Sequence, residues 1–157
     1  MIYCYSNTEN EELDDALTYY VEQFLNDHLG LYNHSDKSVA IESLDDDPKG
    51  SIHGGEDGVV GACYGDRTHA IIELKLSEFK GNFEYLIETL THELIHAKQL
   101  FTGELVNESQ FITIWKGEEF INTTLSMDEY KALPWEKEAY ARQDEWTQCM
   151  IPFAVDF

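Results

Sequence analysis

Hydrophobic residues recur along the chain at two different periods, which divide it into helical and extended segments. From residue 13 to residue 25 the apolar positions follow the three- and four-residue spacing of an amphipathic helix, and Gly30 is a suitable end. Thr8 and Glu11 have the spacing of a capping box ahead of it. We therefore predict an N-terminal helix whose buried face consists of Leu13, Ala16, Leu17, Tyr20, Val21, Phe24 and Leu25.

Short extended segments follow this helix. Residues 39–42 form a β-rich run, and residues 59–64 and 68–76 are two further runs separated by the turn signal Gly65-Asp66-Arg67. Residues 45–58 have the composition of a turn followed by a glycine-rich loop. In the last run every second residue is apolar, namely Ala70, Ile72, Leu74 and Leu76. The pattern predicts a strand, a long loop and then a β-hairpin.

The longest helical pattern runs from Phe83 to Phe101. Asn82 is suited to cap its start, and Gly103 is suited to end it. One side of this helix is apolar along its length, and it consists of Phe83, Leu86, Leu90, Leu94, Ala97 and Phe101. We therefore predict a central helix that packs in the interior.

The remainder of the chain predicts a second hairpin and two more helices. Residues 111–121 contain two β-rich runs around the turn Lys116-Gly117. Residues 126–129 have the S-x-x-E spacing of a capping box, which predicts a short helix. Pro134 suits the first turn of a final helix, which we expect to end near Met150.

Length and composition indicate a single folded domain. The chain has 157 residues, of which 43% are hydrophobic and 13% aromatic. A chain of this size can bury about two-thirds of its unfolded surface in one core. No internal repeat or linker divides it. We therefore predict one α+β domain over residues 1–157, with a small, mostly antiparallel sheet, an N-terminal helix, a central helix and a C-terminal helix.

The charge balance is strongly acidic. The chain has 10 Lys and Arg residues against 31 Asp and Glu residues, a formal net charge of −21, whereas small domains usually carry about 2 to 8 charges of either sign. Such a surface repels nucleic acids and anionic membranes and attracts basic proteins and cations. The basic residues are scattered and form no phosphate-binding cluster. We expect no binding to nucleic acid or membranes, and a partner of basic character.

Cysteine usage and the lack of targeting segments bear on the compartment. Cys4, Cys63 and Cys149 are odd in number and widely spaced, which favours reduced thiols over a disulfide framework or a thiolate metal site. Residues 1–6 lack the basic region and the apolar run of a signal peptide. No stretch approaches the ~20 apolar residues of a membrane span. We expect a cytoplasmic protein.

His92-Glu93-Leu94-Ile95-His96 is an H-E-x-x-H motif in the middle of the central helix. Residues four apart on a helix differ by about 40° in azimuth, so the two imidazoles can bind one metal ion. Glu93 lies about 100° further round, where it can reach a metal-bound water as general base without being a ligand. Catalytic zinc takes three protein ligands, imidazole nitrogen among them, and keeps one position open. The motif predicts a Zn²⁺ site with His92 and His96 as ligands and Glu93 as the catalytic base.

The third ligand has to come from another part of the chain. No histidine follows His96, which leaves Cys149 or a downstream carboxylate. Glu136 and Glu138 lie on the predicted final helix, where a Glu facing the motif helix would complete a two-His, one-Glu zinc site. We choose Glu138 over Glu136, because the small Ala139 beside it would allow the two helices to approach closely.

The motif, together with a downstream Glu-Ala on a helix, resembles the gluzincin metallopeptidases, including the ImmA/IrrE-like peptidases and the minimal gluzincins. The segments Trp115-Lys116-Gly117 and Leu133-Pro134-Trp135-Glu136-x-Glu138-Ala139 also resemble small metallopeptidases encoded by bacteriophages and bacteria. The resemblance covers residues 59–143. If the gene belongs to a phage, the protein would act in the host cytoplasm.

This resemblance implies a zincin-like fold in which the second strand of the first hairpin, residues 68–76, runs along a substrate cleft near the metal. It also implies that His92, His96 and Glu138 bind zinc and that Glu93 is the base. Lys98 departs from the family pattern, which usually has an apolar residue two positions after the second histidine.

The function implied is zinc-dependent hydrolysis of peptide bonds in a protein or peptide substrate, and the acidic surface favours a basic one. Tyr130 and Tyr140 are candidate donors to the oxyanion. Two alternatives remain open. One is an acidic binding protein of phage type that keeps the zincin fold and mimics nucleic acid, although the intact Glu93 argues against it. The other is a structural component that zinc stabilises.

Overall fold

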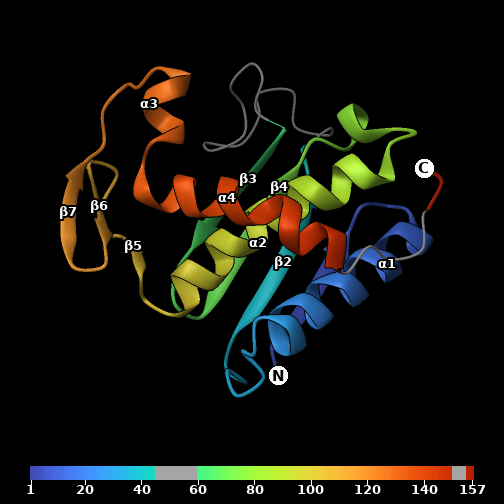
Figure 1. Cartoon of the computed structure of the whole chain (residues 1–157). Coiled ribbons are helices and arrows are strands. Elements are labelled where there is room, and N and C mark those ends of the chain that lie inside the picture. The colour runs from blue at the N-terminus through green and yellow to red at the C-terminus, as the bar shows by residue number, and fades with distance from the viewer. Residues whose placement is uncertain (45–59, 150–154) are drawn as a thin grey trace.

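Two β-sheets and four α-helices make up the part of the chain that the structure, a computed structural model, describes (Figure 1). The described residues are 1–44, 60–149 and 155–157. The turn and loop predicted for residues 45–58, and the helix end predicted near Met150, lie outside them. The α+β class is confirmed. None of the described helices is long and apolar enough to cross a membrane.

The larger sheet has four strands in the order β1-β2-β4-β3. These are β1 (Tyr3–Asn7), β2 (Ser38–Ser43), β3 (Gly61–Gly65) and β4 (His69–Leu74). β3 and β4 form the predicted antiparallel hairpin, whereas β2 pairs in parallel with both β1 and β4. This sheet is therefore mixed, and the prediction of a mostly antiparallel sheet is wrong for it.

The parallel pairing involves a strand that the sequence analysis did not predict. In the N-terminal segment Ile2 and Cys4 are buried while Tyr3 and Tyr5 are exposed, which is the alternation of a strand with one buried face. Parallel neighbours need a crossover connection, and helix α1 (Glu11–Glu22) supplies it between β1 and β2. The short alternation in β1 was the available signal.

Helix α1 begins at Asn10 and not at the predicted capping box. The Asn10 side chain accepts a hydrogen bond of 3.1 Å from the backbone N–H of Leu13. Thr8 instead donates to Asp14 Oδ1, with 2.8 Å from its backbone N–H and 2.8 Å from its hydroxyl. The Asp14 carboxylate thus holds Thr8 outside the helix, and the residue two positions later caps it.

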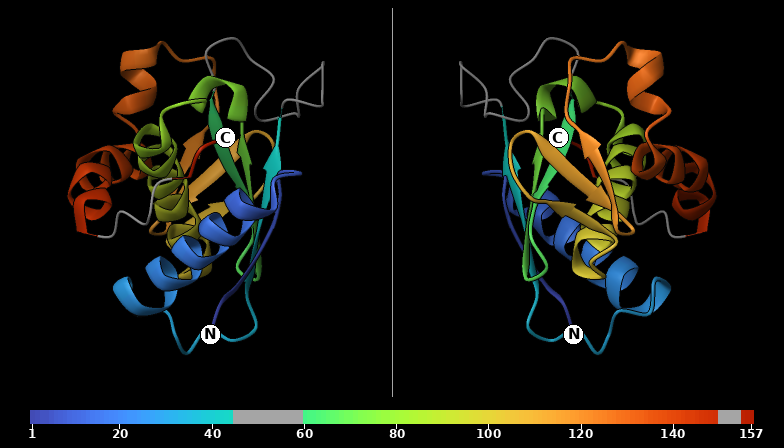
Figure 2. Two further views of the ribbon diagram at one scale, coloured as in Figure 1. Left: turned by 90° about the vertical axis from the view of Figure 1, so that its right-hand side faces the viewer. Right: turned by 90° about the vertical axis from the view of Figure 1, so that its left-hand side faces the viewer.

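Helices α1 and α2 (Phe83–Phe101) cover one face of the four-stranded sheet (Figure 2). α1 continues as a π-helical turn, η1 (Gln23–His28), which ends before Gly30 as predicted. The strand residues that point toward the helices are buried, namely Cys4, Val39, Ile41, Ala70, Ile72 and Leu74. They form one core with the predicted apolar faces of both helices.

Helix α2 has the bounds that the sequence predicts. The Asn82 side chain accepts a hydrogen bond of 3.0 Å from the Tyr85 backbone N–H at its start. Gly103 follows its end at φ +79°, in the left-handed region that glycine adopts without strain. A short 3₁₀ turn, η2 (Leu76–Phe79), connects β4 to this helix. Every residue from Leu90 to Ala97 is buried, so the middle of α2 runs through the interior.

A second, three-stranded antiparallel sheet follows α2. It consists of β5 (Leu105–Asn107), β6 (Ile112–Trp115) and β7 (Glu118–Ile121). β6 and β7 are the second predicted hairpin, whereas β5 was not predicted.

Two further helices complete the described chain. α3 (Met127–Lys131) starts at the predicted capping box of Ser126 and Glu129. α4 (Pro134–Cys149) packs along α2, on the side away from the four-stranded sheet (Figures 1 and 2). The Trp135 ring in its first turn lies 6.3 Å from the Trp115 ring and 5.3 Å from the Phe120 ring, measured between centroids. This aromatic contact fixes the start of α4 against the second sheet.

The turn between β3 and β4 depends on Asp66. Its Oδ1 accepts hydrogen bonds from the Thr68 N–H and hydroxyl, both at 2.8 Å, and from the His69 N–H at 3.0 Å. We expect Asp66→Ala to lower the free energy of unfolding by about 1 kcal/mol at neutral pH. Asp66→Asn should have a smaller effect because its amide oxygen still accepts.

These bonds also lower the pKa of Asp66. A depressed carboxyl pKa gives stability above its ordinary value of 3.8, and that stability is lost as the pH falls below it. Urea unfolding at neutral and acidic pH measures the difference between wild type and Asp66→Ala, which should shrink in acid. Equal stability of the two proteins at neutral pH would contradict this role for the turn.

Candidate metal centre

Helices α2 and α4 bring three potential metal ligands together. His92 and His96 project from one face of α2, one turn apart, and Glu136 projects from the first turn of α4. His92 Nε2 lies 3.1 Å from Glu136 Oε1, and His96 Nε2 lies 2.8 Å from Glu136 Oε2. All three residues are buried, and Glu136 is only 1% exposed. They are the one such group of three or more His, Cys, Asp or Glu residues within the described chain.

The distances fit a metal ion. Zinc binds imidazole nitrogen at about 2.0–2.1 Å and carboxylate oxygen at about 2.0–2.2 Å, so tetrahedral ligand atoms lie roughly 3.3–3.5 Å apart. The observed separations of 2.8 and 3.1 Å need to widen by only a few tenths of an ångström. Two imidazoles and a carboxylate suit zinc and several other divalent transition metals. The group could therefore hold such an ion.

Glu138, the predicted third ligand, does not reach the two histidines, and Glu136 takes its place. The Glu138 carboxylate accepts a hydrogen bond of 3.2 Å from Gln99 Nε2 and lies 3.6 Å from Lys98 Nζ. Its side chain is 25% exposed, at the rim of the helix interface. Residues two apart on a helix point about 200° apart, so Glu136 and Glu138 cannot both face α2.

The spacing around Ala139 would have selected Glu136. Ala139 is fully buried at the contact with α2, as we expected from its small side chain. On a helix the residues three before and four after a buried position share its face, whereas the adjacent residue lies about 100° away. Glu136 and Gln143 stand at those two positions. Helical periodicity, and not adjacency to Ala139, therefore indicates which glutamate faces α2.

Glu93, the predicted base, lies between α2 and the edge strand β3. It is 7% exposed. Burial raises its pKa above the ordinary value, although the nearby His96 and His92 oppose this effect. A Cβ atom added at Gly61 would lie 3.5 Å from both Cγ and Oε1 of Glu93, and only 2.9 Å from Thr89 Cγ2. The absence of a side chain at Gly61 thus allows β3 to pack closely against the glutamate.

Tyr130 and Tyr140, the two tyrosines suggested as oxyanion donors, both lie at this centre. The Tyr140 ring is 4.5 Å from the His92 ring. Burial and the negative charges of Glu136 and Glu93 raise the pKa of Tyr130, and they raise that of Tyr140 in the same way. Both hydroxyls therefore stay protonated at neutral pH and can donate a hydrogen bond.

Three further residues at the centre were not identified from the sequence. Gln143 Oε1 lies 2.6 Å from His92 Nδ1, and Gln99 Oε1 lies 2.8 Å from His96 Nδ1. The third is Cys63 on β3, whose thiol pKa is raised by burial and by the charges of Glu93 and Glu136. For Gln99, a position three residues after His96 on the same helix was an available signal. Neither Cys63 nor Gln143 has a comparable local pattern.

Without a metal ion, the Glu136 carboxylate and His96 stabilise each other's charged forms. Burial by itself lowers the pKa of His96, but the hydrogen bond and charge of Glu136, with help from Glu93 and Gln99, raise it to about 9. Burial raises the pKa of Glu136, but the hydrogen bonds and charges of the two histidines lower it overall. The metal-free centre is thus a buried ion pair near neutral pH.

Comparison of the chain with protein-family models, with curated proteins and with solved structures gives no match. The fold and the centre define the protein as an α+β domain with a buried two-His, one-Glu group. Membership of a gluzincin family stays a prediction from the two sequence motifs.

Substitution of the two glutamates distinguishes their roles. We expect Glu136→Gln to weaken zinc binding by more than about 100-fold, because it removes a ligand and not only a partner of a ligand. Glu138→Gln should change it less than about tenfold, because the new amide oxygen can still accept from Gln99. Competition with a chromophoric chelator measures both affinities, and circular dichroism checks the fold. Equal losses in the two variants would contradict the assignment of Glu136.

The stability of the metal-free protein should fall as the pH rises from 6.5 to about 9. The folded protein keeps the His96 proton to a higher pH than the unfolded chain does, so its contribution is complete below pH 6.5 and is lost as the pH passes about 9. The stabilisation by added zinc should grow over the same range, because the ligands must lose their protons to bind it. Thermal unfolding with chelator and with zinc should therefore give opposite trends. A melting temperature of the chelated protein that does not change with pH would refute the ion pair.

Proposed function

We propose that the protein is a zinc-dependent peptidase, in which His92, His96 and Glu136 hold the ion and Glu93 is the general base. The observation that carries this proposal is the convergence of the three side chains beside a buried glutamate of raised pKa. Catalytic zinc sites have three protein ligands, whereas structural sites are closed by four. Within the described residues the group has three members.

A zinc ion held here would act as a Lewis acid and lower the pKa of a bound water toward neutrality. The role of Glu93 is then to accept a proton from the attacking water and to deliver it to the amine that leaves. The peptide C–N bond breaks, the carbonyl carbon gains the oxygen of the water, and the amine gains the proton. A carboxyl group whose pKa is raised toward neutrality is suited to both transfers.

Tyr130 and Tyr140 are proposed to stabilise the negative charge that develops on the substrate carbonyl oxygen. Their hydroxyls lie in the field of Glu136 and Glu93 and remain protonated at neutral pH. A fixed donor aimed at a developing oxyanion is among the larger contributions to such catalysis. Tyr140 also packs its ring against the His92 ring, so it has a second role in holding the ligand.

The substrate is proposed to be a basic protein or peptide. The net charge of −21 attracts cations and repels polyanions. Attraction between exposed charges is screened by salt, with a Debye length of about 8 Å at physiological ionic strength. Cleavage of basic peptides should therefore be faster than cleavage of acidic ones, and the difference should shrink as salt is added.

The substitution Glu93→Gln tests the catalytic role. It should lower the rate of cleavage of a basic fluorogenic peptide library by about 10²–10⁴-fold, since it removes the proton acceptor. Zinc content should stay stoichiometric, because Glu93 is not among the three grouped residues. Glu84→Gln, an exposed position in the first turn of the same helix, is the matched control and should keep full activity.

Two outcomes would contradict the proposal, the first for the role of Glu93 and the second for peptidase activity itself. Cleavage by Glu93→Gln at the wild-type rate would exclude it as the base. A wild-type protein that binds zinc, cleaves no peptide of the library and unfolds when zinc is removed would be a zinc-stabilised structural or binding protein.

A further inference from the structure

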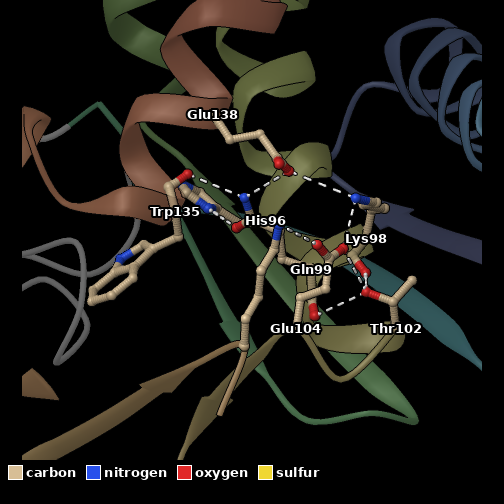
Figure 3. A network of polar contacts seen from close by, with 8 residues as sticks. His96, Lys98, Gln99, Thr102, Glu104, Trp135 and Glu138 are labelled. Carbon is tan, nitrogen blue, oxygen red and sulfur yellow. Dashed lines mark hydrogen bonds and ion pairs between the residues drawn. The ribbon is translucent and has the colours of Figure 1, made fainter. Parts of the chain in front are cut away.

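Gln99 uses every polar atom of its side chain at the helix interface, where it is fully buried. Its Oε1 lies 2.8 Å from His96 Nδ1, and its Nε2 lies 3.1 Å from the Trp135 carbonyl oxygen and 3.2 Å from Glu138 Oε1 (Figure 3). A carbonyl oxygen and a carboxylate only accept hydrogen bonds. Lys98 Nζ lies 3.6 Å from Glu138 Oε1 on the other side of that carboxylate. The amide of Gln99 therefore has one orientation, with its oxygen toward His96.

That orientation determines which nitrogen of His96 carries the proton. An amide oxygen can only accept, so His96 Nδ1 has to donate. A bound metal ion can then take the place of the proton on Nε2, which in the metal-free centre is donated to Glu136 at 2.8 Å. Gln99 also binds the carbonyl of the peptide that joins Trp135 to Glu136. One amide thus orients one ligand through its ring and holds the backbone of another.

His92 has an equivalent arrangement built from different elements. Its Nδ1 lies 2.6 Å from Gln143 Oε1, and Gln143 Nε2 donates to Glu88 Oε1 at 3.1 Å. The Glu88 carboxylate fixes the orientation of the Gln143 amide, in the same way that the Glu138 carboxylate fixes that of the Gln99 amide. This series of hydrogen bonds starts at Glu88 on α2, crosses to Gln143 on α4 and returns to His92 on α2. Both series of hydrogen bonds therefore connect the two helices that carry the proposed metal ligands.

We propose that Gln99 and Gln143 are positioning residues that select the Nδ1-protonated tautomer of His96 and His92, and so aim both Nε2 lone pairs at a common metal ion. The proposal rests on the proposed metal-binding function of the centre. In each series the order is carboxylate, glutamine, histidine. The neutral glutamine amide fixes the orientation of the histidine ring. The carboxylate that orients the amide therefore does not contact the histidine, and it adds no further negative charge directly beside Glu93 and Glu136.

Gln143 is the better position for a test, because it is only half-buried and its loss endangers the fold less than the loss of Gln99. Gln143→Met keeps the length of the side chain and removes the acceptor. The double exchange of Gln143→Glu with Glu88→Gln keeps an acceptor at position 143 and gives it an amide donor in place of the Glu88 carboxylate. Gln110→Met changes an exposed glutamine outside the centre and serves as the control.

We expect Gln143→Met to weaken zinc binding by about 10–100-fold, as for other hydrogen-bond partners of metal-bound histidines. The double exchange and Gln110→Met should stay within about tenfold of wild type. The second measurement is the ¹H–¹⁵N spectrum of the histidine rings in zinc-loaded protein, because without the metal the Glu136 carboxylate accepts from Nε2 of both rings. Wild type and the double exchange should show a His92 Nδ1–H proton that is protected from exchange with solvent, and Gln143→Met should lose that protection. A merely structural role would not move this signal.

The two measurements separate the failure of each proposal. If zinc-loaded wild type shows His92 bound to the metal through Nδ1, or if Gln143→Met changes neither the affinity nor the exchange of the Nδ1–H proton, the positioning role is refuted and the metal centre stands. The same holds if the double exchange loses as much as Gln143→Met. If wild type binds no zinc, the metal centre is refuted and the positioning role falls with it.

Discussion

The burial of the Glu136 carboxylate is the constraint on which the packing of α4 depends. An ionised carboxylate that is 1% exposed costs several kcal/mol in lost hydration unless charge and hydrogen bonds compensate. His92 and His96 provide that compensation, with or without a metal ion between them. Among the described side chains of α4, the buried ones are Trp135, Glu136, Ala139 and Thr147. Only two of these four residues are apolar. The contact between α4 and α2 therefore depends on the interaction of Glu136 with the two histidines as well as on buried apolar area.

The four-stranded sheet sets the environment of Glu93. β3 is the edge strand that packs against α2, and Gly61 permits an approach that any side chain would obstruct. Close packing on this side removes water from Glu93 and raises its pKa. The helix therefore supplies the position of Glu93, while the sheet supplies the low polarity that raises its pKa.

Lys98 pairs with two partly exposed carboxylates behind His96. Lys98, which departs from the pattern of the family that the motif resembles, lies 2.7 Å from Glu104 and 3.6 Å from Glu138 (Figure 3). Its side chain is 24% exposed, so its charge remains partly in water. The lysine thereby holds in place the carboxylate that orients Gln99, in a chain whose other charges are mostly negative. A polar residue at this position is consistent with the hydrogen-bond chain behind His96.

Local signals in the sequence were sufficient for the central helix from cap to stop, the two hairpins, and the pairing of His92 with His96 around Glu93. These follow from helical and strand periods and from capping chemistry, which act over a few residues. The parallel pairing of β1, the choice of Glu136 over Glu138, and the roles of Gln99 and Gln143 depend on contacts between elements far apart in the chain. Only the tertiary structure decides these, because rotating α4 by one or two residues exchanges the carboxylate that faces α2 while leaving its local helical pattern unchanged.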